Sequence, residues 1–141
     1  MPERPRIMFL CTANSARSQL AEAILRDRAG DEIMACSAGT NPATVHPLAI
    51  EVLQEIEVRT DGLRSTSVDE VLADGPVNMT IAVCAAASST CPFVAGEAVR
   101  SWPFDDPAAC EGDDDARREA FRTARDQIAA KIDSWLEAGR P

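Results

Sequence analysis

The chain has 141 residues, enough for one domain with a single hydrophobic core. Its 14 basic and 23 acidic residues give a net charge of −9, which argues against binding to nucleic acid or to anionic membranes, because both require basic surfaces. No segment has the roughly 18 consecutive apolar residues of a membrane-spanning helix, and the N-terminus lacks the apolar stretch of a secretory signal, so we expect a cytoplasmic protein.

The N-terminal half alternates strand and helix patterns. Residues 7–11 form a continuous apolar run, as expected for a strand that is buried on both faces. A pattern with helical spacing begins at Ser15 and ends at Gly30. A second strand is predicted at 32–37, and a second helix at 47–55.

The C-terminal half continues this alternation. A short helix is predicted at 68–72, and 79–84 is another buried apolar run, which ends in a cysteine. Residues 85–96 are small and polar, which indicates a long loop or a weak helix, and 98–102 is a candidate last strand. Acidic residues begin a long amphipathic helix at 113–136. This order predicts an α/β fold in a single domain spanning 1–141, with a parallel sheet, helices on both faces, and functional residues at the carboxyl ends of the strands.

A cysteine and an arginine bracket the loop after the first predicted strand. Cys11 ends the strand, and Arg17 lies near the start of the next helix. Inward-facing N–H groups and the helix dipole make such a loop an anion site, to which Arg17 adds a guanidinium suited to a tetrahedral oxyanion. The positive field of the helix N-terminus and Arg17 favours the thiolate of Cys11, which makes Cys11 a candidate nucleophile. Ser18 can donate a hydrogen bond to this sulfur, and Asn14 can brace the loop. We expect the anion to be bound by Thr12, Ala13, Asn14, Ser15, Ala16 and Arg17.

The run 11–22, CTANSARSQLAE, resembles the phosphate loop of the low-molecular-weight tyrosine phosphatase superfamily, in the form found in its thioredoxin-coupled arsenate reductases. The resemblance continues through 37–39 (SAG) and reaches 102–107 (WPFDDP), so it covers most of the chain. It implies a three-layer sandwich whose four-stranded parallel sheet, in the order 2-1-3-4, is flanked by helices. Ala13 departs from the pattern, since reductases commonly carry Gly there, and the loop must accept a negative φ or some strain.

The resemblance assigns the general acid to Asp106, which precedes Pro107 as the corresponding aspartate does in the superfamily. A carboxylic acid at this place protonates the oxygen that leaves arsenic or phosphorus. The residues alone leave the neighbouring Asp105 open as an alternative, and Asp-Pro is also a common turn dipeptide.

Two further cysteines distinguish the reductases from the phosphatases. Cys84 ends a predicted strand, as Cys11 does. The strand order that the resemblance implies makes these two strands neighbours, about 4.8 Å apart, which permits a disulfide between their ends. The spacing from Cys84 to Cys91, followed by Pro92, resembles the resolving pair of thioredoxin-coupled reductases. The resemblance therefore implies a relay: Cys84 attacks the sulfur of Cys11, arsenite leaves, Cys91 attacks Cys84, and thioredoxin reduces the final disulfide.

Other residues of interest have weaker assignments. Cys36 and Cys110 have no place in the relay, and His46 is expected near a helix start, because Pro47 follows it. The cysteines and the one histidine lack the paired spacing of a zinc site, and we expect no tightly bound cofactor. The resemblance brings a candidate potassium site formed by Asn14, Glu22, Ser37 and Ser65.

These features predict a monomeric arsenate reductase of arsenic detoxification, which takes arsenate as substrate, phosphate or sulfate as mimics, and thioredoxin as electron donor. A glutaredoxin or another thiol stays open as the donor. One alternative is a low-molecular-weight protein phosphatase that uses only Cys11, Arg17 and Asp106; against it, Ala108 stands where tyrosine phosphatases usually carry Tyr. A non-catalytic oxyanion or redox sensor is the other alternative, and it would not turn over.

Overall fold

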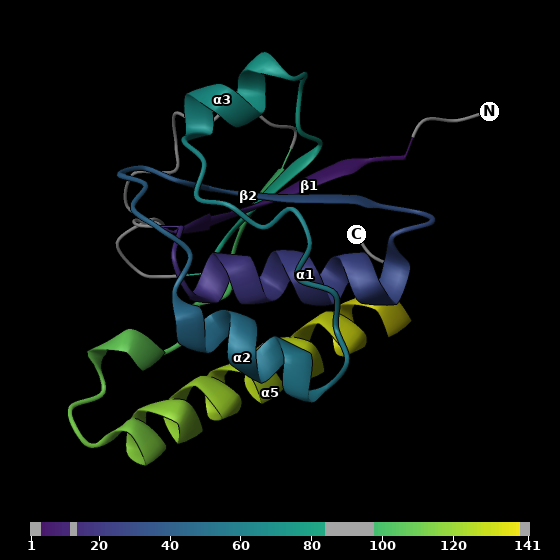
Figure 1. The fold of residues 1–141 in the computed structure, drawn as a ribbon. Helices are drawn as coiled ribbons and strands as arrows, with labels where there is room; N and C mark the ends of the chain where they lie inside the picture. The colour runs from purple at the N-terminus through teal and green to yellow at the C-terminus, as the bar shows by residue number, and fades with distance from the viewer. Residues whose placement is uncertain (1–3, 12–13, 84–97, 139–141) are drawn as a thin grey trace.

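The computed structural model describes residues 4–11, 14–83 and 98–138. The chain forms, in order, β1 (Arg6–Cys11), α1 (Arg17–Ala29), β2 (Met34–Gly39), α2 (Pro47–Glu55), α3 (Val68–Ala73), β3 (Met79–Ala82), β4 (Ala98–Ser101), the 3₁₀ helix η2 (Pro107–Ala109) and α5 (Asp114–Glu137) (Figure 1).

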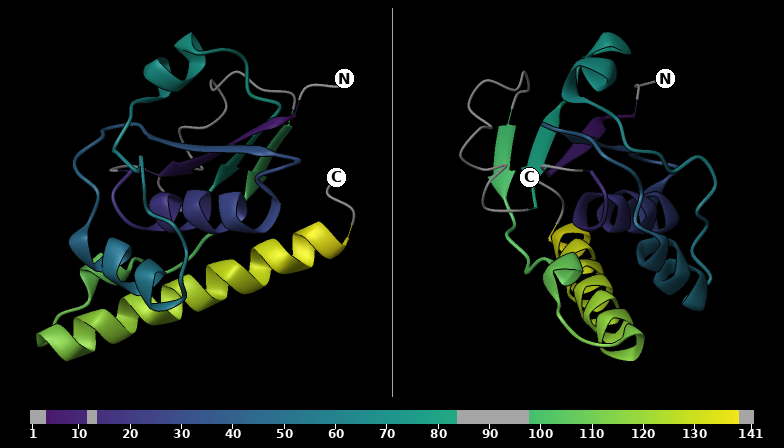
Figure 2. Two further views of the ribbon diagram at one scale, coloured as in Figure 1. Left: turned by 45° about the vertical axis from the view of Figure 1, so that its right-hand side comes forward. Right: turned by 60° about the vertical axis from the view of Figure 1, so that its left-hand side comes forward.

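The described strands form one parallel sheet of four strands in the order β2-β1-β3-β4, which confirms the predicted order. The helices α1, α2 and α5 lie on one face of the sheet and α3 on the other, giving the three layers that were expected (Figures 1 and 2). The termini of the strands align closely, since Leu10 of β1 pairs with both Ala38 of β2 and Ala82 of β3. The carboxyl ends of the central strands therefore meet at one edge.

The central strand β1 is almost wholly apolar because it is covered on both faces. Met8, Phe9 and Leu10 are each completely buried. Beyond β3, Val83 continues the ladder by donating its N–H to the carbonyl of Leu10 at 2.9 Å. Val83, the last residue described before the gap, thus lies beside the end of β1. Cys84, and the predicted loop at 85–96, lie outside the described residues.

The helix α1 starts later than predicted, at Arg17 instead of Ser15. Ala16 has φ −122° and ψ −78°, which is not helical, and its carbonyl accepts the first helical bond from Leu20 at 2.9 Å. At the other end Gly30 closes the helix as predicted: a Cβ there would lie 2.5 Å from the carbonyl oxygen of Arg26, so a larger residue would force the backbone apart.

The strand β2 is displaced by two residues from the prediction, running from Met34 to Gly39 instead of 32–37. The reason is local, because the N–H groups of Glu32 and Ile33 both bond back to the carbonyl of Ala29 and complete a turn after α1. The strand begins only after that turn. The other predicted elements agree with the structure within a residue or two at each end, including α5, which Asp113 caps by accepting from Ala116 N–H at 2.8 Å.

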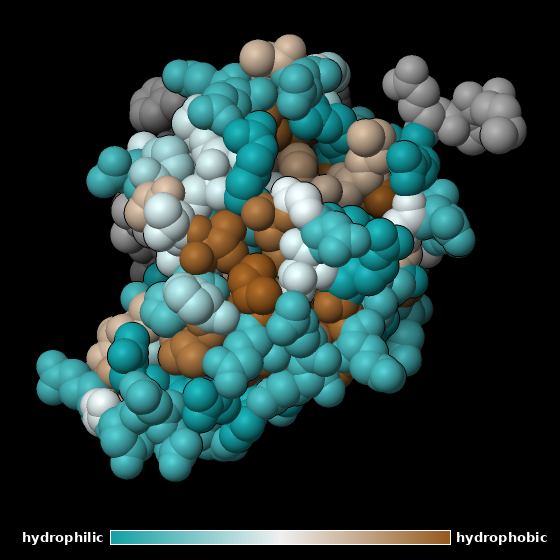
Figure 3. Space-filling model, in the orientation of Figure 1, coloured by the Kyte–Doolittle hydropathy of each residue, from teal (hydrophilic) through white to brown (hydrophobic). Residues whose placement is uncertain are grey.

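The core lies between the sheet and the layer of α1 and α5. Buried side chains of both helices meet there, namely Leu20, Ile24, Leu25, Phe121, Ile128 and Ile132. On the outside, Figure 3 shows hydrophilic side chains along α5 and apolar side chains gathered over α1 and α2. Among the described residues no helix is both long and apolar enough to cross a bilayer.

A core truncation should show how much this layer contributes. Ile24 is fully buried, so Ile24→Ala should lower the free energy of unfolding by about 2–5 kcal/mol through lost apolar contacts and the remaining cavity. The matched control is Ile56→Ala, because Ile56 is 37% exposed and should lose far less. Urea unfolding measures both, and equal losses would contradict this description of the core.

Candidate active site

The loop between β1 and α1 brings the predicted anion-binding residues to the carboxyl edge of the sheet. Cys11, at the end of β1, is buried, with 4% of its surface exposed. Arg17 begins α1, so the N-terminus of that helix faces the loop. Thr12 and Ala13 lie outside the described residues.

Asn14 holds the loop from inside. Its backbone has φ 51°, a left-handed conformation that asparagine accepts more readily than most residues. The side chain is fully buried and donates to Ser18 Oγ at 2.8 Å, while Oδ1 accepts the N–H of Thr66 at 2.8 Å. Its carbonyl accepts from Gln19 Nε2 at 2.9 Å and from Ser65 Oγ at 2.7 Å. The brace predicted at Asn14 is therefore present, but Gln19, Ser65 and Thr66 were not foreseen as its partners.

The hydroxyl of Ser18 is hydrogen-bonded to the anion loop. Its oxygen accepts from Asn14, so its own O–H can still be donated. The residue is completely buried in the first turn of α1. This arrangement is compatible with the predicted bond to the sulfur of Cys11.

Arg17 reaches from α1 across to the loop that carries Asp106. Its Nη1 donates to the carbonyl of Phe104 at 2.9 Å, and its Nη2 lies 3.7 Å from Asp106 Oδ2. Its Nε is buried and has no hydrogen-bond partner among the described residues. A buried donor left unpaired is costly, and an oxyanion in the loop would satisfy it.

Asp106 is held in place by the turn that follows it. Its Oδ1 accepts the N–H of Ala108 at 3.0 Å, which caps η2, and Pro107 is buried as the first residue of that turn. The side chain remains 43% exposed. Of the two candidate acids, Asp106 is the one whose carboxylate lies beside Arg17.

His46 connects the anion loop to α2. Its backbone N–H donates to the carbonyl of Ser15 at 2.9 Å, and its Nδ1 accepts the N–H of Leu48 at 3.1 Å. The ring packs against Phe121 with centroids 4.6 Å apart. Burial, reinforced by Arg117, lowers the pKa of His46. The sequence placed this residue near a helix start, which is confirmed, but gave no sign of its bond to the loop.

The four residues of the candidate potassium site form two hydrogen-bonded pairs, each of which offers oxygen atoms. Ser37 Oγ donates to Glu22 Oε1 at 2.6 Å, and Ser65 Oγ donates to the carbonyl of Asn14. Burial raises the pKa of Glu22, opposed by the bond from Ser37 and by Arg26. Oxygen donors that include a buried carboxylate fit a hard cation.

The remaining described cysteines are Cys36 and Cys110. Cys36 is half-buried in β2, with its Sγ 3.5 Å from the carbonyl of Ile7. Burial raises the pKa of Cys36 to about 11, although Arg6 acts in the opposite direction. Its thiol is therefore protonated at neutral pH and is a poor nucleophile. Cys110 follows η2, and Cys84 and Cys91 lie outside the described residues.

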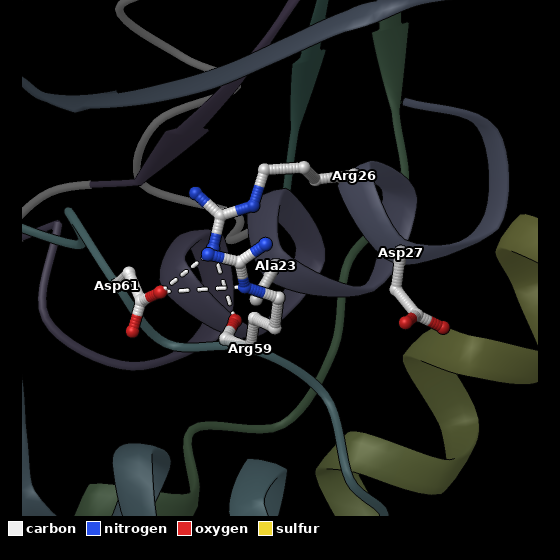
Figure 4. A pocket seen from close by; sticks show the side chains of 5 residues that line it. All are labelled: Ala23, Arg26, Asp27, Arg59 and Asp61. Carbon is white, nitrogen blue, oxygen red and sulfur yellow. Dashed lines mark hydrogen bonds and ion pairs between the residues drawn. The ribbon is translucent and has the colours of Figure 1, made fainter. Parts of the chain in front are cut away.

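A separate hollow of about 410 Å³ on the outer side of α1 contains no residue of the loop. Figure 4 shows its lining, Ala23, Arg26, Asp27, Arg59 and Asp61. The cations there already have partners: Arg59 pairs with Asp61 at 2.7 Å, and Arg26 donates to the carbonyl of Arg59 at 2.9 Å. The hollow thus lacks the unpaired donor that marks the loop as an anion site.

Comparison with known proteins decides the family. Residues 6–139 match the sequence profile described as low molecular weight phosphotyrosine protein phosphatase. The chain belongs to this family. An arsenate reductase of Halalkalibacterium halodurans is 36% identical over 135 residues, which cover 95% of this chain and 96% of the relative.

Solved structures of arsenate reductases have a similar fold. An arsenate reductase in its phosphate-binding state superposes with a TM-score of 0.79 at 27% identity, covering 95% of this chain and 98% of the other. The thioredoxin-dependent arsenate reductase of Corynebacterium glutamicum superposes with a TM-score of 0.73 at 25% identity, over 96% of this chain and 61% of that longer chain.

Substitutions at Asn14 should separate its backbone role from its side-chain role. Both Asn14→Gly and Asn14→Ala remove the bonds to Ser18 and Thr66, but only alanine is strained at φ 51°. Alanine should therefore cost about 1–2 kcal/mol more in the free energy of unfolding than glycine does. Urea unfolding compares them; equal costs would show that the left-handed backbone is unimportant.

Proposed function

We propose that the protein reduces arsenate to arsenite with Cys11 as nucleophile, Arg17 and the loop as anion site, and Asp106 as general acid. The observation that carries this proposal is the buried Nε of Arg17, which has no hydrogen-bond partner among the described residues and belongs to the first residue of α1, at the end of the loop that Cys11 begins. The 36% identity to an arsenate reductase over nearly the whole chain favours arsenate over other tetrahedral oxyanions.

In the first step the thiolate of Cys11 attacks arsenic, an arsenic–sulfur bond forms and an arsenic–oxygen bond breaks. Asp106 gives its proton to the departing oxygen, which leaves as water. Before substrate arrives, Arg17 is engaged by the Phe104 carbonyl and by Asp106. Binding of the anion competes for the guanidinium, and this releases Asp106 to act on the leaving oxygen.

In the second step Cys84 attacks the sulfur of Cys11. The arsenic–sulfur bond breaks, arsenic keeps the electron pair and leaves as arsenite, and a Cys11–Cys84 disulfide remains. The adjacency of β1 and β3 supports this step, because Val83 bonds to Leu10 at 2.9 Å immediately before Cys84.

In the third step Cys91 attacks Cys84 and frees Cys11 as a thiolate. The new Cys84–Cys91 disulfide receives two electrons from thioredoxin, the donor that one structural relative's name specifies. Such a relay requires a compartment that keeps thiols reduced, so we place the protein in the cytoplasm. Every proposed group comes from one chain, and the protein acts as a monomer.

A potassium ion held by Asn14, Glu22, Ser37 and Ser65 is part of the same proposal. The ion would supply positive charge beside the buried Glu22 carboxylate. The role of these residues is to keep Asn14, and with it the anion loop, in one conformation.

The decisive assay is arsenate-dependent NADPH oxidation with thioredoxin and thioredoxin reductase. Wild type should turn over, whereas Cys84→Ser and Cys91→Ser should lose turnover, because each breaks the path of electrons out of the loop. Cys36→Ser is the matched control and should turn over like wild type, since the Cys36 thiol is protonated at neutral pH. Full activity of the Cys91 variant with thioredoxin would refute the relay.

The phosphatase alternative uses Cys11, Arg17 and Asp106 but needs no resolving cysteine. Hydrolysis of p-nitrophenyl phosphate should therefore survive Cys84→Ser even though arsenate turnover is lost. Hydrolysis by wild type without any arsenate-dependent NADPH oxidation would favour the phosphatase.

Replacing Asp106 tests the general acid. Asp106→Asn should slow the arsenate-dependent step by about 10²–10⁴-fold, since an amide has no proton to give. The adjacent Asp105→Asn is the control and should change the rate little, because among the described residues the ion pair with Arg17 is made by Asp106 and not by Asp105. Single-turnover arsenite release measures both, and the reverse order of effects would move the acid to Asp105.

A further inference from the structure

The helix α2 has an unusual cap. Its N-cap residue is His46, whose imidazole Nδ1 accepts the N–H of Leu48 at 3.1 Å. Serine, threonine, aspartate and asparagine are the usual caps, because their short side chains reach this N–H easily. Pro47 has no N–H, so the N–H of Leu48 is the first in the helix that needs an acceptor. The imidazole therefore fixes the first turn of α2.

The backbone of the same residue holds the anion loop. The N–H of His46 donates to the carbonyl of Ser15 at 2.9 Å, and the carbonyl of His46 accepts from Ala49 at 3.0 Å. Ser15 follows Asn14, which Ser65 and Thr66 hold from the other side. Two consecutive residues of the loop are thus held by hydrogen bonds from different segments, and the bond to Ser15 comes from His46.

The imidazole is arranged to stay neutral. A ring that accepts at Nδ1 carries its proton on Nε2, and a second proton on Nδ1 would oppose the N–H of Leu48. Burial and Arg117 of α5 lower the pKa of His46 from its usual 6.5, while Asp106 raises it. The ring also packs on Phe121 of α5 at 4.6 Å, which limits its rotation.

We propose that His46 is a positioning residue for the anion loop: by capping Leu48, its neutral imidazole orients the backbone N–H that holds Ser15. The loop's affinity for a tetrahedral oxyanion then depends on this cap, although the imidazole touches no anion. The inference rests on the proposed function, since it assumes that the loop binds arsenate.

The test is phosphate binding by isothermal titration calorimetry at pH 7.5, alongside the Michaelis constant for arsenate. His46→Ala removes the cap and should weaken phosphate binding about fivefold, the effect expected if the free energy of one lost N-cap is expressed in the loop. His46→Asn restores a neutral acceptor and should bind within about twofold of wild type. Ile132→Val, deep in the core, is the control for general destabilisation.

The outcomes separate the two proposals. Weaker binding by His46→Ala, with rescue by asparagine and no effect of Ile132→Val, supports the positioning role. Wild-type affinity in His46→Ala, or an equal loss in Ile132→Val, overturns it and leaves the proposed function standing. A wild-type chain that neither binds phosphate nor reduces arsenate refutes the proposed function itself.

A second measurement needs no variant that might fold poorly. His46 is the single histidine of the sequence, so its imidazole gives one unambiguous set of nitrogen NMR signals. The cap requires the Nε2–H tautomer at neutral pH. A predominant Nδ1–H tautomer, or an imidazolium at pH 7.5, would overturn the inference.

Discussion

The structure depends on the conformation of a few backbone groups where β1 turns into α1. Asn14 of this loop adopts a left-handed conformation, and a loop of this kind holds an anion through inward-facing N–H groups. Ser18 and Gln19 of α1 bond to Asn14 from nearby in the chain. Distant groups add further hydrogen bonds to the loop, from Ser65 and Thr66 before α3 and from His46 at the start of α2. The sheet and the helices serve to bring these groups together.

The net charge of the protein also shows that anion binding must depend on local groups. The protein carries a net charge of −9, so its overall field repels an arsenate ion. Attraction must come from short-range groups: the N-terminus of α1, the amides of the loop, and the mostly buried guanidinium of Arg17. In the absence of an anion Arg17 is engaged by a carbonyl and faces a carboxylate, so the positive charge is not left without a counterpart. Under the proposed function, the small accessible part of this positive charge favours a small tetrahedral anion.

Much of the fold was predictable because it follows from local apolar patterns. The run at 7–11 is apolar throughout, and the structure buries it on both faces. The predicted starts of α1 and β2 were wrong because a single turn sets each of them. Nothing in the types of Ser15 and Ala16 shows that the helix begins only at Arg17. Likewise, nothing in Glu32 and Ile33 shows that their N–H groups bond back to Ala29 and delay the strand. The bonds from Ser65, Thr66 and His46 to the loop were also missed, because contacts across such sequence separations leave no periodic signal. The roles of Thr12, Ala13, Cys84 and Cys91 stay predictions, since these residues lie outside the described part of the chain.

Cys36 is one of five cysteines in the sequence, and the proposed relay does not use it. Its sulfur lies in β2 against the carbonyl of Ile7, and its pKa of about 11 keeps it a thiol. A thiol of this kind attacks a disulfide far more slowly than a thiolate does, because the fraction ionised at neutral pH is very small. If the proposed relay operates, Cys36 on the edge strand β2 is therefore a poor competitor for its disulfides, and a cysteine can remain at this position without diverting electrons from the relay.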